Sequence, residues 1–286
     1  MTRRTLVLVG AAAGSLVQGC SCGGGDCSVV VPLDGGSLMG FSRGLALDAG
    51  ACNVLCASTS APGGGCTVES ATSARCSVQC IGGRAPPGLQ TLSAVDGSAA
   101  SWLARMGELE GAAVAAFLHL ADELDAHGLS SFSQGALGAA RDEVRHARAL
   151  TGLALSFGAA PRANAITQTP VRSLFEVALD NAAEGCGRER FGAHVNVLQA
   201  AHAEDAHVRA VMHGLAADEL AHAHFSESLD ATLRTKLTVA QRRRLSEARE
   251  QALLSLSSSP VPEAMRRTLG LPDVDASRAL VDTLLH

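Results

Sequence analysis

The sequence predicts an all-α protein built on a bundle of four long helices, with a long crossover between the second and third. Two observations favour this class. A short motif of acidic and histidine residues occurs at positions 142–146 and again at 218–222, in segments rich in Ala and Leu. The composition is 47% hydrophobic but only 3% aromatic, with no Tyr. We therefore expect a core of Ala, Leu and Val side chains at helical spacing.

Residues 1–19 are typical of a signal peptide. Two arginines at positions 3 and 4 precede an apolar run over residues 6–17, which is too short to span a bilayer as a mature helix. The Val-Gln-Gly-Cys sequence that follows resembles the lipobox of bacterial lipoproteins. We predict that Cys20, or else Cys22, is lipidated and anchors the protein to a bacterial membrane, facing the periplasm or the cell surface. The paired arginines leave both Sec and twin-arginine export open.

Residues 20–97 are predicted to be a tether and a small Cys-rich loop module, because they are rich in Gly, Ser, Pro and Cys. Many cysteines among few large apolar residues in an exported chain predict disulfide bonds. A metal knuckle is the alternative, since two pairs of cysteines lie four residues apart, although zinc sites favour a gap of two residues. Beyond Cys20, the cysteines of this segment are Cys22, Cys27, Cys52, Cys56, Cys66, Cys76 and Cys80.

The four long helices are expected within residues 98–233. The first covers about 98–127 and the second about 130–157, and a glycine follows each of them. The third covers about 171–203 after a proline, and Asp205 caps the fourth. The link over 158–170 contains two prolines and no helical period. Extended, it reaches about 45 Å, whereas a 25-residue helix is about 37 Å long, so the link can cross the full height of the bundle.

Residues 234–286 are predicted to form a C-terminal helical extension. Thr238 caps a charged helix that continues to about residue 256, and short helices are expected near 262–269 and 276–285. These segments carry no motif, and we interpret them as packing against the bundle.

The repeated motif has the pattern Asp-Glu-x-x-His. A Glu and a His three residues apart share one face of a helix. A Glu-Gly pair, with a Phe seven residues after the Glu, precedes each copy at a similar distance: Glu110 precedes Glu143, and Glu184 precedes Glu219. Two helical hairpins would thus bring together four carboxylates and two histidines.

One Glu from each of two helices and a Glu-x-x-His from each of the other two is the arrangement of a carboxylate-bridged dinuclear metal site. In these residues, roughly 98–233 resemble the ferritin-like di-iron carboxylate superfamily, and are most similar to an exported lipoprotein branch of unassigned reaction. The resemblance implies a ferritin-like four-helix bundle. The predicted metal ligands are Glu110, Glu143, His146, Glu184, Glu219 and His222.

Charge supports two metal ions at these ligands. Four carboxylates gathered in a core raise one another's pKa unless cations neutralise them, and two divalent ions balance their charge. Neutral histidines complete an oxygen-rich ligand set suited to iron or manganese, with zinc also possible. The ligands alone do not choose among these metals, but the resemblance favours two iron ions.

Three charged residues are expected around the ligands. A metal-binding His commonly donates its second ring N–H to a carboxylate. We predict a crossed pairing, Asp142 with His222 and Asp218 with His146, which the resemblance also implies. Arg188 lies four residues after one predicted ligand and is expected at the edge of the site, either as a charge beside the ligands or with its stem along the apolar surface.

Three functions stay open on this basis: an oxidoreductase acting on dioxygen, peroxide or ferrous iron; a non-catalytic metal-binding protein; and a structural surface lipoprotein. With no Tyr, a tyrosyl radical like that of the ribonucleotide reductase small subunit is excluded. The net charge of -5, without a basic stripe, argues against a nucleic-acid partner. The expected partners are a membrane, through the lipid, and a small-molecule oxidant or metal ion.

Overall fold

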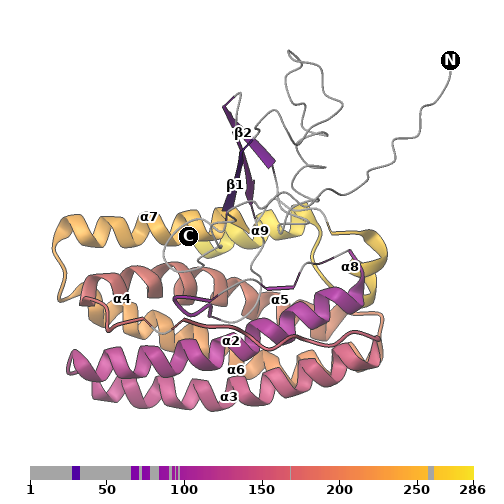
Figure 1. Ribbon diagram of the computed structural model, residues 1–286, viewed down its shortest axis with the longest axis horizontal. Helices are drawn as coiled ribbons and strands as arrows, with labels where there is room; N and C mark the ends of the chain where they lie inside the picture. Colours follow the sequence, from indigo (N-terminus) through magenta and orange to yellow (C-terminus); the bar gives the residue numbers. More distant parts are fainter. Residues whose placement is uncertain are drawn as a thin grey trace.

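The computed structural model describes residues 28–32, 66–70, 73–77, 84–89, 92–93, 95, 97–167, 169–256 and 261–286 (Figure 1). From residue 97 onward the described chain is helical apart from the links between helices, which confirms the all-α class for this part. The predicted signal peptide, the lipidation site at Cys20 and most of the predicted disulfide cysteines lie outside the described residues.

Three short strands lie in the N-terminal part of the chain, where the composition predicts loops. Strands β1 (Ser28–Pro32), β2 (Cys66–Ser70) and β3 (Ser73–Ser77) form an antiparallel sheet in the order β1-β3-β2. Three consecutive valines in β1 favour a strand, because β-branched side chains suit the pleated backbone. The expectation of a loop module is therefore corrected for these three segments.

Helices α2 (Ala99–Ala126) and α3 (Ser130–Ser156) form the first antiparallel pair and pack along their length. The hydroxyl of Ser98 caps α2 by accepting a hydrogen bond from the backbone N–H of Ser101. Gly128 has a φ of +72°, a left-handed conformation that ends the helix. These local signals explain why the predicted bounds agree with the structure to within two residues.

The second pair consists of an interrupted helix and helix α6 (Ala206–Arg234). The interrupted helix comprises α4 (Leu174–Asp180), a π-helical segment η1 (Asn181–Glu189) and α5 (Arg190–His202). It begins three residues later than predicted, because Ser173 and Glu176 form a capping box. Both η1 and α5 pack against α6, and α6 also contacts α3. The π-helical segment was not predicted.

The link between α3 and α4 runs alongside α2 (Figure 1). Near its start, the backbone N–H of Arg162 donates to Glu108 at 2.9 Å. Near its end, Nε and Nη2 of Arg172 each donate to the carboxylate of Glu123 at 2.8 Å. Because Glu108 and Glu123 lie about four helical turns apart on α2, the link crosses most of the helix, in agreement with the prediction. Consequently α4 starts at the far end of α2 and runs parallel to α3.

The C-terminal extension is helical, as predicted. Helix α7 (Val239–Ser255) packs on η1 and α4, and the shorter α8 (Glu263–Leu269) and α9 (Val274–Leu285) follow it. None of the helices in the described residues has both the length and the apolar character needed to cross a bilayer.

Two large clusters make up most of the apolar core, beside a small third one of Ala85, Leu89 and Ala112. One cluster includes Leu103 of α2, Leu150 of α3 and Met212 of α6. The other includes Leu120 of α2 and Leu229 of α6. On α2, α3, the interrupted helix and α6, the stretch between the two clusters carries buried polar side chains. A polar layer therefore crosses all four helices at one level.

Candidate metal centre

Six ionisable side chains fill this polar layer. All are at most 3% exposed, and they come from all four helices. An isolated charge in such surroundings is costly unless it is paired or binds a metal. The six are Glu110 of α2, Glu143 and His146 of α3, Glu189 of η1, and Glu219 and His222 of α6.

Their ligand atoms form two overlapping groups that could each hold a metal ion, with every atom of a group within 4.8 Å of the others. Glu143 and Glu219 belong to both groups, so each carboxylate could bridge two ions. The first group is Glu110, Glu143, His146 and Glu219. The second group is Glu143, Glu189, Glu219 and His222.

The ligand atoms face one another without forming hydrogen bonds. Nδ1 of His146 lies 2.9 Å from Oε1 of Glu219, and Nδ1 of His222 lies 3.1 Å from Oε1 of Glu143. Seven atoms of the six residues are buried and make no hydrogen bond: Oε2 of Glu110, both carboxylate oxygens of Glu143, Nδ1 of His146, Oε1 of Glu189, Oε1 of Glu219 and Nδ1 of His222. Buried polar atoms rarely stay unpaired, so this convergence fits a site that can bind a cation.

The other ring nitrogen of each histidine contacts an aspartate of the opposite motif. Nε2 of His146 lies 3.2 Å from Oδ2 of Asp218, and Nε2 of His222 lies 3.3 Å from Oδ2 of Asp142. These are the crossed contacts predicted from the sequence. When the aspartate accepts a hydrogen bond from the Nε2 N–H of a neutral ring, Nδ1 carries no proton. Its lone pair then faces the other ligand atoms.

Arg145 joins the two aspartates and was not predicted. Its Nη1 donates to Asp142 at 2.6 Å within α3, and its Nη2 donates to Asp218 of α6 at 2.9 Å. Burial raises the pKa of Asp218, but His146 and Arg145 outweigh it and lower the pKa. The equivalent position in the second motif is Ala221, so a single arginine serves both aspartates.

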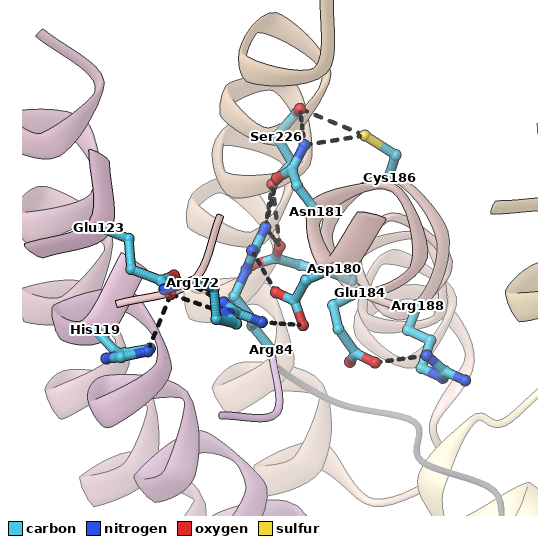
Figure 2. Close-up of polar contacts among 11 residues, drawn as sticks. Arg84, His119, Glu123, Arg172, Asp180, Asn181, Glu184, Cys186, Arg188 and Ser226 are labelled. Atoms are coloured by element: carbon cyan, nitrogen blue, oxygen red, sulfur yellow. Dashed lines mark hydrogen bonds and ion pairs between the residues drawn. The ribbon is translucent and has the colours of Figure 1, made fainter. Parts of the chain in front are cut away.

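The structure groups Glu189, and not the predicted ligand Glu184, with the other five residues. Glu184 is in neither group, and its Oε1 accepts a hydrogen bond from Nη1 of Arg188 at 2.5 Å (Figure 2). In a π-helix, backbone hydrogen bonds join residues five apart, so Glu184 and Glu189 share a face one turn apart. Glu189 is the one at the level of the two motifs. Arg188, predicted beside the ligands, instead pairs with Glu184.

A weak signal for this irregularity is present in the sequence. Gly185 and Gly187 stand in mid-helix, where each glycine costs about 1 kcal/mol relative to alanine. A Cβ on Gly187 would lie 3.0 Å from the Cβ of Ala252 in α7, so the close approach of α7 favours glycine here. Two glycines so close to a Glu could have indicated an interruption of the regular α-helix. The repeated Glu-Gly pattern pointed instead to Glu184.

When no metal neutralises them, burial and mutual repulsion are the main causes that raise the pKa values of the carboxyl groups in the two candidate metal groups. Burial, followed by Glu143, raises the pKa of Glu110 well above its usual value and also raises that of Glu219. Burial raises the pKa of Glu189 to about 7. Glu143 behaves differently: burial opposes its ionisation, but the adjacent histidines outweigh burial and lower its pKa to about 2.

The pKa values of the two histidines are also raised, which favours the charged form of a histidine but the neutral form of a carboxyl group. Burial disfavours their charged forms, but the facing carboxylates outweigh it and raise the pKa of His146 to about 10 and that of His222 to about 9. Without a metal, the facing carboxylates therefore favour the form of each ring that is protonated on both nitrogens. A cation that binds Nδ1 must displace the Nδ1 proton of that form, so binding is linked to proton release.

Three ionisable residues that stand two positions from a predicted ligand lie outside the site. Glu108 is buried, and its carboxylate accepts from the backbone N–H of Ser93 at 2.7 Å and from Arg162. Cys186 is buried beside the backbone oxygen of Ser226, and burial raises the pKa of its thiol to about 12. His224 is exposed on α6. None of the three belongs to either ligand group.

By their geometry these residues form a candidate metal centre. Comparison of the chain with protein-family models, with curated proteins and with solved structures finds no match.

Proposed function

We propose that this chain is an exported ferritin-like protein that binds two iron ions and acts as an oxidoreductase on dioxygen, peroxide or ferrous iron. One observation carries the proposal: seven buried ligand atoms without hydrogen bonds converge in two groups that share two carboxylates. Such a ligand set is typical of carboxylate-bridged dinuclear sites.

The residues present fit two cations. Glu110 and His146 would bind only the first ion, Glu189 and His222 only the second, and Glu143 and Glu219 would bridge both. Burial, and after it repulsion by Glu143, raises the pKa of Glu110, and two divalent ions would neutralise the four carboxylates and so remove the repulsion. Carboxylate oxygens and imidazole nitrogens suit iron, manganese and zinc, and the resemblance to di-iron carboxylate proteins selects iron.

The helix arrangement also supports the proposal. The four elements α2, α3, α4-η1-α5 and α6 would be the ferritin-like bundle, with the crossover along α2 joining its second and third helices. Two of these elements contribute one Glu each, and the other two contribute a Glu-x-x-His each, as in ferritin-like di-iron proteins.

The surroundings of the centre favour a small substrate. Ferrous ions bound there would supply electrons to the oxidant. The apolar clusters on either side are mostly aliphatic, and the ring of Phe117 packs 5.3 Å from that of His222. Asp142 and Asp218 hold the outward nitrogen of each histidine, so Nδ1 keeps facing the ligand atoms. Dioxygen, peroxide and ferrous iron are small enough for such a site.

Anaerobic loading with ferrous iron tests the binding step. We expect about two iron ions per chain by elemental analysis, and a clear loss in Glu143→Ala, because that residue is shared by both groups. Glu184→Gln is the matched control, since it changes a buried carboxylate of η1 that belongs to neither group. Absence of specifically bound iron in the wild type would overturn the metal assignment.

Stopped-flow mixing of the iron-loaded protein with dioxygen or peroxide tests the reaction. We expect near-ultraviolet absorption to rise with the wild type and not with Glu143→Ala. A flat spectrum, with the bound iron still ferrous, would contradict the oxidoreductase assignment and leave non-catalytic metal binding as the function.

A further inference from the structure

An arginine from outside the four helices lies in the core beside the proposed centre. Arg84 precedes α2 and is 1% exposed. Its Nη1 lies 3.5 Å from Oδ2 of Asp180, and its Nη2 donates to Asn181 at 2.8 Å and to Ser226 at 3.2 Å (Figure 2). The same Nη2 lies 3.8 Å from Oε2 of Glu189, one of the proposed ligands. Polar groups thus contact the buried guanidinium of Arg84 on several sides.

The pocket around this guanidinium is shaped for it. On one side, Cζ of Arg84 lies 5.4 Å from the ring centroid of Phe117, a cation–π contact. On the other side is Gly185, where a Cβ would lie 2.3 Å from Nη2 of Arg84 and 2.6 Å from Oγ of Ser226. The missing side chain at Gly185 therefore gives the guanidinium its space.

Glu189 is held by one oxygen and offers the other. Its Oε2 accepts a hydrogen bond from Ser226 at 3.2 Å and faces Arg84. Its Oε1 makes no hydrogen bond and lies 3.9 Å from Nδ1 of His222. Glu110 has the equivalent place in the first ligand group, and the described residues show no arginine or lysine paired with it.

We propose that Arg84 is a positioning residue for Glu189 and thereby builds the second of the two metal positions selectively. Together with Ser226 it holds Oε2, so that Oε1 faces His222. The inference rests on the proposed metal centre. It predicts two unequal positions, of which only the one made by Glu189 and His222 depends on a residue outside the four helices.

Cobalt(II) titration of the full chain, followed by visible absorption and by equilibrium dialysis, tests this inference. We expect the wild type to bind about two ions, and Arg84→Gln to bind one ion as tightly as the wild type and the other at least about tenfold more weakly. Gly185→Ala should have the same effect, because its methyl group would displace the guanidinium and the adjacent Ser226, which together hold Oε2, while every ligand and charge is kept. Arg172→Gln is the matched control, since Arg172 also pairs with Asp180 but contacts no proposed ligand among the described residues.

Combined substitutions identify which ion is affected. Arg84→Gln added to His222→Ala should cause no further loss of cobalt, because both act on the second position. Added to His146→Ala, which removes a ligand of the first position, it should weaken binding of the second ion by the same factor as it does alone. A residue that only stabilised the fold would lower both affinities together.

The outcomes separate this inference from the proposed function. A wild type that binds no cobalt would refute the metal centre itself. Two ions bound with wild-type affinity in both Arg84→Gln and Gly185→Ala would refute only the role of Arg84. Equal weakening of both ions in folded variants, checked by circular dichroism, would also refute it. Should Arg84→Gln fail to fold, Gly185→Ala decides the question.

Discussion

Arg145 of α3 donates to Asp218 of α6, with Nη2 and Oδ2 2.9 Å apart, and so joins the two copies of the motif at the surface. Because the same guanidinium also holds Asp142, each histidine contacts an aspartate that this arginine fixes. The orientation of both rings thus depends on one solvent-facing side chain.

Arg145→Ala should weaken metal binding at both positions by about tenfold, because groups that orient metal-binding histidines commonly have effects of this size. Competition with a chelator would measure the two affinities. Arg148→Ala, an exposed arginine of the same helix, should leave them unchanged. Wild-type affinities in Arg145→Ala would show that Asp142 and Asp218 orient the histidines without the hydrogen bonds from Arg145.

Asp218→Asn should act on only one position. The aspartate contacts His146, so the amide removes the charge that favours a proton on Nε2 and weakens binding at the ion bound by His146. We expect a loss of about ten- to a hundredfold for that ion by cobalt titration, with the ion at His222 little affected. A larger effect on the His222 position would contradict the crossed arrangement.

The ion pair between Glu123 and Arg172 should stabilise the fold in a pH-dependent way. Burial raises the pKa of Glu123, but Arg172 outweighs it and lowers the pKa below that of the unfolded chain. The contribution is therefore fully present above the unfolded pKa and is lost as pH falls through the lower folded pKa. Glu123→Gln should cost about 3 kcal/mol in urea unfolding of the metal-free protein at neutral pH. The difference from wild type should shrink in acid, and a pH-independent difference would refute the ion-pair account.

Cys20 is expected to carry the lipid. Mass spectrometry of the mature protein isolated from membranes should show an acylated first residue at Cys20, whereas Cys20→Ser should abolish membrane anchoring. Cys22→Ser is the matched control and should stay anchored. An unmodified N-terminus in the wild type would exclude a lipoprotein.

Much of the helical architecture could be predicted because its signals are local. Gly128 and Gly158 end helices, and Asp205 and Thr238 cap them, so the bounds of α2, α3, α6 and α7 follow from short stretches of sequence. Five of the six residues in the two candidate metal groups could be predicted for the same reason, since the motif and Glu110 need only an α-helical period.

The remaining parts depend on contacts that no local pattern encodes. The π-helical segment changes the number of residues per turn inside the third helix. A prediction made with 3.6 residues per turn therefore places Glu184, and not Glu189, at the level of the two motifs. Arg84 has no motif around it, and its hydrogen bonds join it to residues 96 or more positions away. The role of Arg145 required knowing which faces of α3 and α6 meet.

The polar layer that divides the apolar core also bears on how the protein opens. The backbone amides around each apolar cluster lie in a separately packed region. Without a cation, we expect the polar layer between the two regions to contribute little to the stability of the closed state. Local opening should then proceed in two cooperative units, with different hydrogen-exchange protection on either side of the centre. Two cations, whose ligands together come from all four helices, would couple the two units, so that both exchange together.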